Sequence, residues 1–86
     1  MEVQKIPLEE GVSPLKTIRT LLGMTQSQFA HVIGCEKETV SRWERGVYPA
    51  TFTISQMKAL DKTLKSAGFD LQDLPDSFAP YKSKSA

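Results

Sequence analysis

The sequence MTQSQFAHVIGCEKETVSRWERG, residues 24–46, decides the fold of this chain. It holds two short segments whose apolar residues recur at helical spacing, joined only by the residues from Gly34 to Glu36. Because this connection is so short, the two helices must cross steeply and cannot run back antiparallel. The second segment also carries a row of polar side chains that a packed core would exclude. We therefore expect the function to lie on that row.

The first of these two helices has clear signals at both ends. Thr25 and Gln28 form the T-x-x-Q pattern of a capping box, in which each side chain satisfies a terminal backbone N–H group. Gly34 is predicted to end the helix. Its buried side is predicted to consist of Phe29, Ala30 and Ile33.

The second helix is predicted to run from about Lys37 to Arg45, with Gly46 as its stop. Val40 and Trp43 are spaced to point inward. The spacing of Trp43 from Val40 makes it a core residue and not a base-stacking one.

A further helix precedes this stretch. Ser13 is a good N-cap, Pro14 suits the first helical position, and Gly23 stands where a helix would end. Its apolar face is predicted to contain Leu15, Ile18, Leu21 and Leu22.

The chain after Gly46 predicts a loop, VYPAT, and then another helix. Thr51 or Thr53 is expected to cap this helix, which runs to about Ser66. One apolar side is predicted to comprise Phe52, Ile54, Met57, Leu60 and Leu64. A last helical turn begins at Asp70 and ends at Pro75, and its neighbourhood can fold back onto the core through Phe69, Leu71 and Leu74. We predict an all-α, compact domain of four to five helices.

Three regions are predicted along the chain. Residues 1–12 form an N-terminal arm that lies extended against the domain or a partner, or is partly disordered. Residues 13–75 form the helical domain. Residues 76–86 form a polar tail that we expect to be flexible, although Phe78 and Tyr81 could dock.

Composition excludes several further classes of function. The chain has 86 residues and a formal charge of +1, so it is one small domain and not a polybasic binder. Its single cysteine, Cys35, cannot form an internal disulfide, and no Cys/His cluster has zinc-site spacing. Neither a signal peptide nor a membrane-spanning run is visible. We expect a cytoplasmic protein without a metal, a cofactor or contact with a membrane.

The stretch from Met24 to Gly46 resembles the helix-turn-helix of phage repressors and Cro proteins, the XRE family. Small Ala30 stands where the two helices touch, and Gly34 stands where the turn needs a positive φ. The ending W-E-R-G is similar to the family's closing pattern of a hydrophobic residue, Glu, any residue and Gly. The resemblance extends from Leu15 to about Leu64, and it implies a lambda-repressor-like fold that binds double-stranded DNA through its third helix.

The same resemblance implies which residues face the DNA. The base-contacting set is Gln26, Lys37, Glu38, Thr39 and Arg42. Arg and Lys can donate to guanine O6 and N7, and Glu can accept from cytosine N4. The phosphate-contacting set is Thr25, Ser41, Arg45 and Tyr48. Gln26, at the start of its helix, is also close enough to the phosphates to belong to either set.

The family also has a buried ion pair, which here falls on Arg19 and Glu44. We assign this pair a structural role, because it would tie the first helix to the end of the third. Glu36 departs from the family pattern, which usually has Ser or Thr as the N-cap at that position. Glu38 leaves two readings open, since it either faces a base or holds Arg42 through an i,i+4 pair.

These observations predict a sequence-specific transcriptional regulator, a homodimer on a short inverted repeat of DNA. The alternative is an interaction module, such as the antitoxin of a toxin pair, whose arm or tail binds a partner protein. We expect no enzymatic activity and no small-molecule substrate, because the sequence has no nucleophile, metal or acid–base constellation.

Overall fold

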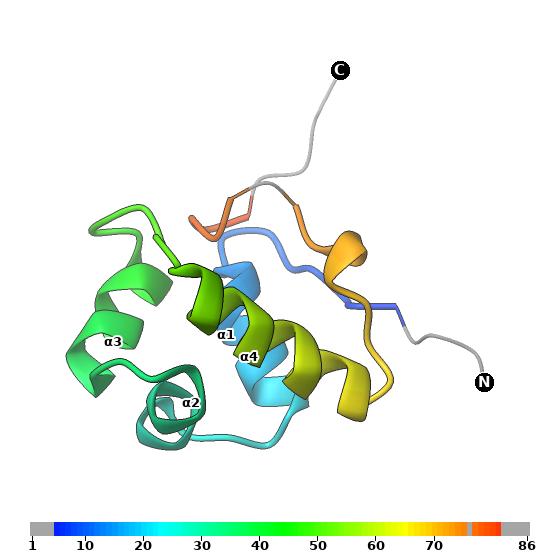
Figure 1. The fold of residues 1–86 in the computed structure, drawn as a ribbon. Coiled ribbons are helices and arrows are strands. Elements are labelled where there is room, and N and C mark those ends of the chain that lie inside the picture. The colour runs from blue at the N-terminus through cyan, green and yellow to red at the C-terminus, as the bar shows by residue number, and fades with distance from the viewer. Residues whose placement is uncertain (1–4, 76, 82–86) are drawn as a thin grey trace.

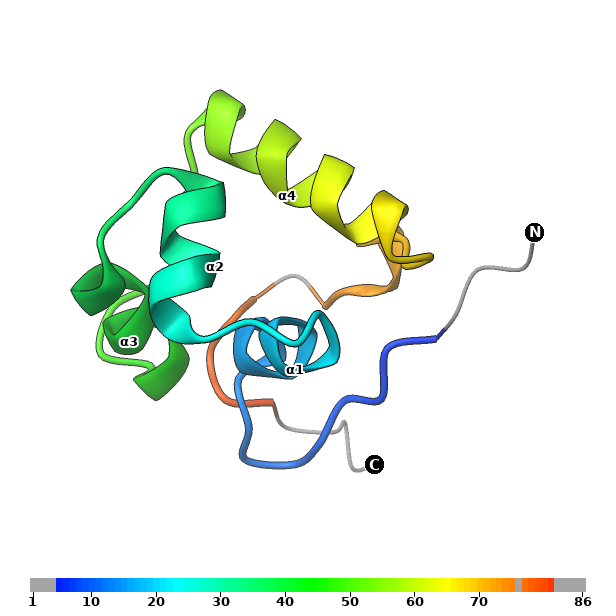
Figure 2. The same ribbon diagram turned by 90° about the horizontal axis from the view of Figure 1, so that it is seen from below.

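A computed structural model of the chain describes residues 5–75 and 77–81. Within these ranges the fold is all-α, as predicted. The helices are α1 (Pro14–Leu21), α2 (Gln26–Ile33), α3 (Lys37–Arg45), α4 (Ile54–Ser66) and the 3₁₀ turn η1 (Leu71–Asp73). Helix α2 packs against both α3 and α4, and α1 packs against α3. Helix α3 lies at the outer edge of the molecule in both views (Figures 1 and 2).

Side-chain caps explain where three of the helices begin. The Ser13 hydroxyl accepts the N–H of Leu15, so Ser13 is the N-cap of α1. Thr25 and Gln28 form the predicted capping box at α2, with distances of 3.1 and 2.9 Å. Of the two candidate caps for α4, Thr53 is the one used, and it forms a second capping box with Gln56.

Glycines end α2 and α3 in the left-handed conformation. Gly34 has φ of 91° and Gly46 has φ of 75°. Residues with a Cβ adopt this conformation at a cost of roughly 1–2 kcal/mol. The sharp turn between α2 and α3 therefore depends on Gly34, and the exit from α3 depends on Gly46.

One hydrophobic core joins the four α-helices. Its buried members are Ile6, Leu15, Ile18, Phe29, Ala30, Ile33, Val40, Trp43, Leu60, Leu64 and Phe69. Trp43 is a core residue, as predicted, and its ring stacks on Phe52 with centroids 4.8 Å apart. Leu71 and Leu74 are partly buried against the same core.

Three predicted core positions were wrong. Leu21 is 40% exposed, Met57 is 37% exposed and Ile54 is 78% exposed. Leu21 is the last residue of α1 and Ile54 the first of α4, whereas Met57 lies within α4. Apolar spacing identifies the face of a helix but not how far the partner helices extend along it.

The end of the described chain lies against residues 11–13, just before α1. We call residues 77–81 the C-terminal segment; it is orange to red in Figures 1 and 2. The N–H of Gly11 donates to the carbonyl of Tyr81 at 2.8 Å, and the N–H of Tyr81 donates to the carbonyl of Val12 at 3.0 Å. The Ser13 hydroxyl donates to the carbonyl of Phe78 at 2.6 Å.

The C-terminal segment also contacts the chain that follows α3. The ring of Phe78 lies 5.6 Å from that of Phe52. A Cβ atom placed on Gly46 would lie only 2.9 Å from Cδ of Pro80. The segment therefore packs against the start of the loop between α3 and α4.

Candidate nucleic-acid interface

Helix α3 has one buried face and one exposed face. Its buried residues are Val40, Trp43 and Glu44. Glu38, Arg42 and Arg45 are exposed on the other side, at spacings of four and three residues that place them in one row. Lys37 is also exposed, and Thr39 and Ser41 are partly buried at the two margins of the row.

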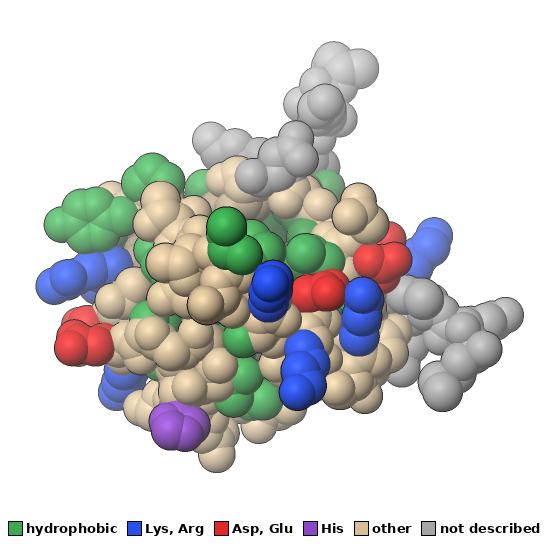
Figure 3. Space-filling view, in the orientation of Figure 1, with side chains coloured by type: hydrophobic (Ala, Val, Ile, Leu, Met, Phe, Trp, Pro, Cys, Tyr) green, Lys and Arg blue, Asp and Glu red, His purple; other side chains and the backbone are tan. Residues whose placement is uncertain are grey.

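The exposed row mixes positive and negative charge. Figure 3 shows Lys or Arg side chains on both sides of an acidic one along the left edge, where α3 lies. Among the described residues the ion pairs join Arg19 to Glu44 and Lys65 to Asp61. The structure thus does not contain the i,i+4 pair between Glu38 and Arg42 that we considered as an alternative.

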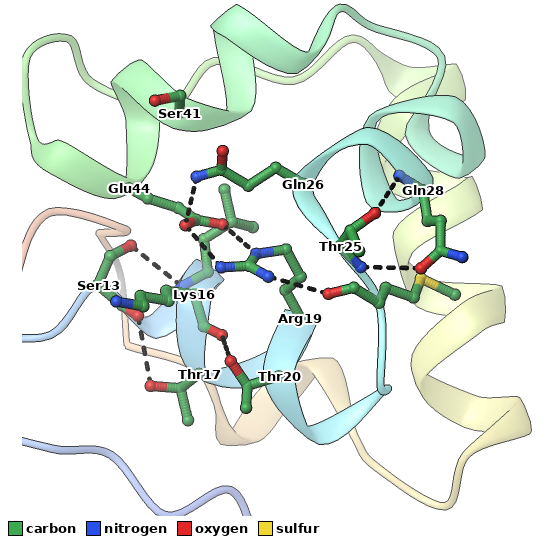
Figure 4. A network of polar contacts seen from close by, with 12 residues as sticks. Ser13, Lys16, Thr17, Arg19, Thr20, Thr25, Gln26, Gln28, Ser41 and Glu44 are labelled. Carbon is green, nitrogen blue, oxygen red and sulfur yellow. Dashed lines mark hydrogen bonds and ion pairs between the residues drawn. The ribbon is translucent and has the colours of Figure 1, made fainter.

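A bidentate ion pair fixes α3 against α1. Arg19 Nε donates to Glu44 Oε2 at 2.6 Å, and Arg19 Nη2 donates to Oε1 of the same carboxylate at 3.1 Å (Figure 4). Arg19 Nη1 also donates to the carbonyl of Met24 at 2.9 Å. One guanidinium therefore holds both the end of α3 and the turn that precedes α2.

Gln26 joins this network from the start of α2. Its amide nitrogen donates to Glu44 Oε1 at 3.1 Å. Sequence reasoning placed Gln26 beside the DNA but missed this bond. The two residues are 18 positions apart and share no local pattern, so only the packing of α2 on α3 reveals it.

The residues predicted to contact phosphates are spread around α3. Thr25 is exposed, but its hydroxyl already accepts the N–H of Gln28 in the capping box. Arg45 is exposed and its Nε donates to the carbonyl of Ser41 at 3.4 Å. Tyr48 is 57% exposed in the loop after α3, which carries no Lys or Arg between Gly46 and Thr53.

Glu36 begins α3 without a side-chain cap. It has the extended backbone of an N-cap residue, but its carboxylate makes no hydrogen bond to the first turn. The terminal N–H groups of α3 therefore lack the side-chain partner that Ser or Thr would supply. The exposed negative charge of Glu36 also stands directly before the row that would face DNA.

Two other chemically active side chains, Cys35 and His31, lie on or next to α2. Cys35 is half-buried in the turn between α2 and α3, and burial together with the nearby charge of Glu36 raises the pKa of its thiol. His31 is exposed on α2. Residues 5–75 and 77–81 contain no group of three or more His, Cys, Asp or Glu side chains that could hold a metal ion.

A helix-turn-helix family model matches residues 15–67. This match covers well over half of the chain. The chain belongs to the helix-turn-helix family of the Cro and XRE type. Neither a search of curated proteins nor a search of solved structures found a significant match.

Membership in this family relates the exposed row on α3 to DNA binding. In the family the second helix of the motif, here α3, is the recognition helix, and the domain is a DNA-binding one. The matched residues include the exposed row, Gln26 and the Arg19–Glu44 pair, but not the C-terminal segment. No helix in the described part of the chain is long and apolar enough to cross a lipid bilayer.

Proposed function

We propose that this helix-turn-helix protein is a sequence-specific transcriptional regulator that places α3 in the major groove of DNA. The observation that carries the proposal is the exposed polar row on α3, opposite a buried face that fixes the orientation of the helix. The major groove is about 12 Å wide, so it admits one α-helix. Each base pair presents a distinct set of donors and acceptors there.

The residues of the row differ in whether they donate hydrogen bonds to bases or accept them. Arg42 and Lys37 donate and suit guanine O6 and N7, whereas Glu38 accepts and suits cytosine N4. Thr39, at the margin of the row, can contact a base through its hydroxyl or its methyl group. The proposed phosphate contacts are made by Thr25, Ser41, Arg45 and Tyr48, with the N-terminus of α2 adding the attraction of its backbone N–H groups.

The modest positive charge of one domain favours binding to DNA as a dimer. The recognition helix offers Lys37, Arg42 and Arg45, but Glu36 and Glu38 oppose them near phosphates. Two copies on an inverted repeat, with half-sites about 34 Å apart, would combine two weak contacts into one strong one. We therefore propose a homodimer as the form that binds the operator.

Selection of bound sequences from random DNA tests the proposal most directly. A regulator of this kind selects an inverted repeat, and the repeat gives the half-site spacing. Fluorescence anisotropy on the selected site should then show affinity that falls steeply as salt rises, because phosphate contacts release counterions. Failure to enrich any sequence, together with affinity that is indifferent to salt, would contradict DNA binding.

A further inference from the structure

The loop between α3 and α4, residues 46–53, has few hydrogen bonds to hold its course. The N–H of Val47 donates to the carbonyl of Arg42 at 3.0 Å, and Thr53 begins the capping box of α4. Between them, residues 48–52 form no hydrogen bond with any other residue of the described ranges. The path of the loop therefore depends on what packs against it.

The C-terminal segment packs against this loop at both of its ends. At the first end, a Cβ atom on Gly46 would lie 2.9 Å from Cδ and 3.5 Å from Cγ of Pro80, so the proline ring lies directly against the backbone of Gly46. At the other end, the ring of Phe78 lies 5.6 Å from that of Phe52, which also stacks on Trp43. One segment of five residues thus restrains the two ends of the loop together.

The C-terminal segment is itself firmly anchored. Gly11 and Val12 bond to the backbone of Tyr81, and the Ser13 hydroxyl donates to the carbonyl of Phe78 at 2.6 Å. Ser13 is only 1% exposed, so this last bond is shielded from water. Figures 1 and 2 show the segment between the chain that leaves α3 and the blue chain that enters α1. The segment therefore connects the loop to the start of α1.

Tyr48 lies between the two restrained ends, two residues after Gly46 and four before Phe52. Its side chain is 57% exposed, and its hydroxyl can donate to a phosphate oxygen. The loop has no Lys or Arg, so no positive charge of its own draws it toward DNA. A loop that is ordered before binding loses less entropy on contact with its ligand.

We propose that the C-terminal segment takes part in DNA binding by holding this loop, through Pro80 and Phe78, so that Tyr48 meets the phosphate backbone. Pro80 and Phe78 are positioning residues, because they touch the loop and not the DNA. This inference rests on the proposed function, and it gives a DNA-binding role to residues outside the matched range 15–67.

Nuclear magnetic resonance relaxation of the free protein tests the packing without DNA. Phe78→Ala should lower the order parameters of the Val47 and Tyr48 amides from about 0.85 toward 0.6, the range of flexible backbone. Leu71→Ala is the matched control, because Leu71 is also partly buried but lies on η1, which packs against α4. Unchanged order parameters in Phe78→Ala would overturn the proposal.

Pro80→Ala is a milder second variant of the same test. It removes only the ring atoms beside Gly46 and keeps the Phe78 ring and the bonds to residues 11–13. It should loosen the same two amides. Circular dichroism checks that each variant folds, and Pro80→Ala carries the test if Phe78→Ala does not fold.

Fluorescence anisotropy, at a temperature where every variant is folded, then tests the effect on DNA. Phe78→Ala and Tyr48→Phe should each lose roughly 3- to 10-fold in affinity, the value of one hydrogen bond, and Leu71→Ala should lose none. The loss should be equal on the selected site and on random DNA, because a phosphate contact carries no sequence information. The salt dependence should not change, because Tyr48 is uncharged.

Double variants separate positioning from a general loss of stability. Phe78→Ala/Tyr48→Phe should bind no more weakly than Tyr48→Phe, because the contact that Phe78 supports is already gone. Phe78→Ala/Arg42→Ala should show both losses, since the two residues act on different contacts. Additive losses in Phe78→Ala/Tyr48→Phe would overturn the proposal.

Three other results would also overturn it. A loss in Phe78→Ala that is confined to the selected site, or that comes with a shallower salt dependence, would place its effect on α3, which Phe52 reaches through Trp43. Full affinity in Tyr48→Phe would remove the phosphate contact. If Phe78→Ala loosens the loop but the wild type binds no DNA, the proposed function has failed, and the DNA-binding role of the segment fails with it.

Discussion

Arg19 in α1 and Glu44 in α3 meet face to face, with Nε 2.6 Å from Oε2 and Nη2 3.1 Å from Oε1. The side chain of Arg19 is 14% exposed and that of Glu44 is 4% exposed, so water screens the pair little. Helix α1 carries none of the proposed DNA contacts, yet this pair makes it part of the support for the recognition helix.

Glu44→Ala should lower the free energy of unfolding by about 3–5 kcal/mol, because it leaves the mostly buried guanidinium of Arg19 without its carboxylate partner. Urea denaturation measures this loss. The double variant Arg19→Met/Glu44→Met removes both charges and should be more stable than Glu44→Ala. A double variant as unstable as the single one would show that the pair does more than balance two buried charges.

Arg42→Ala should weaken binding to the selected site by about 1–3 kcal/mol and change binding to random DNA much less, because Arg42 is proposed to contact a base. Fluorescence anisotropy on both DNAs measures the two effects. Lys62→Ala, at an exposed position on α4, removes the same charge away from the recognition helix and serves as the control. Equal losses on both DNAs would reassign Arg42 to a phosphate.

Glu36→Ser should stabilise the protein by about 0.5–1 kcal/mol, since it supplies the cap that α3 lacks. It should also tighten DNA binding, since it removes a negative charge beside the recognition helix. Glu36→Ala removes the charge without adding a cap. We therefore expect both variants to gain affinity but only the serine to gain stability in urea denaturation; equal stability would argue against the cap.

Gly46→Ala should destabilise the protein more than Gly34→Ala. Both substitutions force a residue with a Cβ into a positive φ, at roughly 1–2 kcal/mol. Only at position 46 would the new Cβ also meet Pro80, at 2.9 Å, whereas nothing lies within 4 Å at position 34. Urea denaturation of both variants, and of Gly46→Ala/Pro80→Ala, separates the two costs. The added Pro80→Ala should recover part of the loss, and no recovery would mean that Pro80 does not press on position 46.

The Cys35 thiol should react slowly with an alkylating reagent near neutral pH. Burial and Glu36 raise its pKa in the folded state, so less thiolate is present than in the unfolded chain. The rate should rise with pH in a higher range than for the same chain unfolded in urea. Because the folded state holds this proton more tightly, the contribution of Cys35 to stability is complete below the pKa of the unfolded thiol and is lost as pH rises through the folded pKa. A reaction as fast in the folded as in the unfolded chain would contradict this.

Local signals in the sequence predicted most of the fold. The caps at Ser13 and Thr25 and the bounds of α3 depend on neighbouring residues only, and the structure confirms them. The exposed positions of Ile54 and Met57 could not be predicted in this way, since exposure depends on which other elements pack against α4.

The candidate site was less accessible to sequence reasoning. The polar row on α3 follows from helical spacing, and the structure exposes Lys37, Glu38 and Arg42. The bond from Gln26 to Glu44 joins two helices, and spacing along one helix cannot show it. The same holds for the hydrogen bond between Ser13 and Phe78, which are 65 positions apart.

The C-terminal segment determines how much of the chain must be retained when this protein is shortened or fused to another protein. The family match covers residues 15–67, yet Ile6, Ser13 and Phe69, all buried, lie outside it. A chain trimmed to the matched residues would lose the cap of α1 and uncover the Phe52 ring that stacks on Trp43, behind the recognition helix. Grafting this DNA-binding domain onto another protein therefore requires residues 5–81, not the recognisable motif alone.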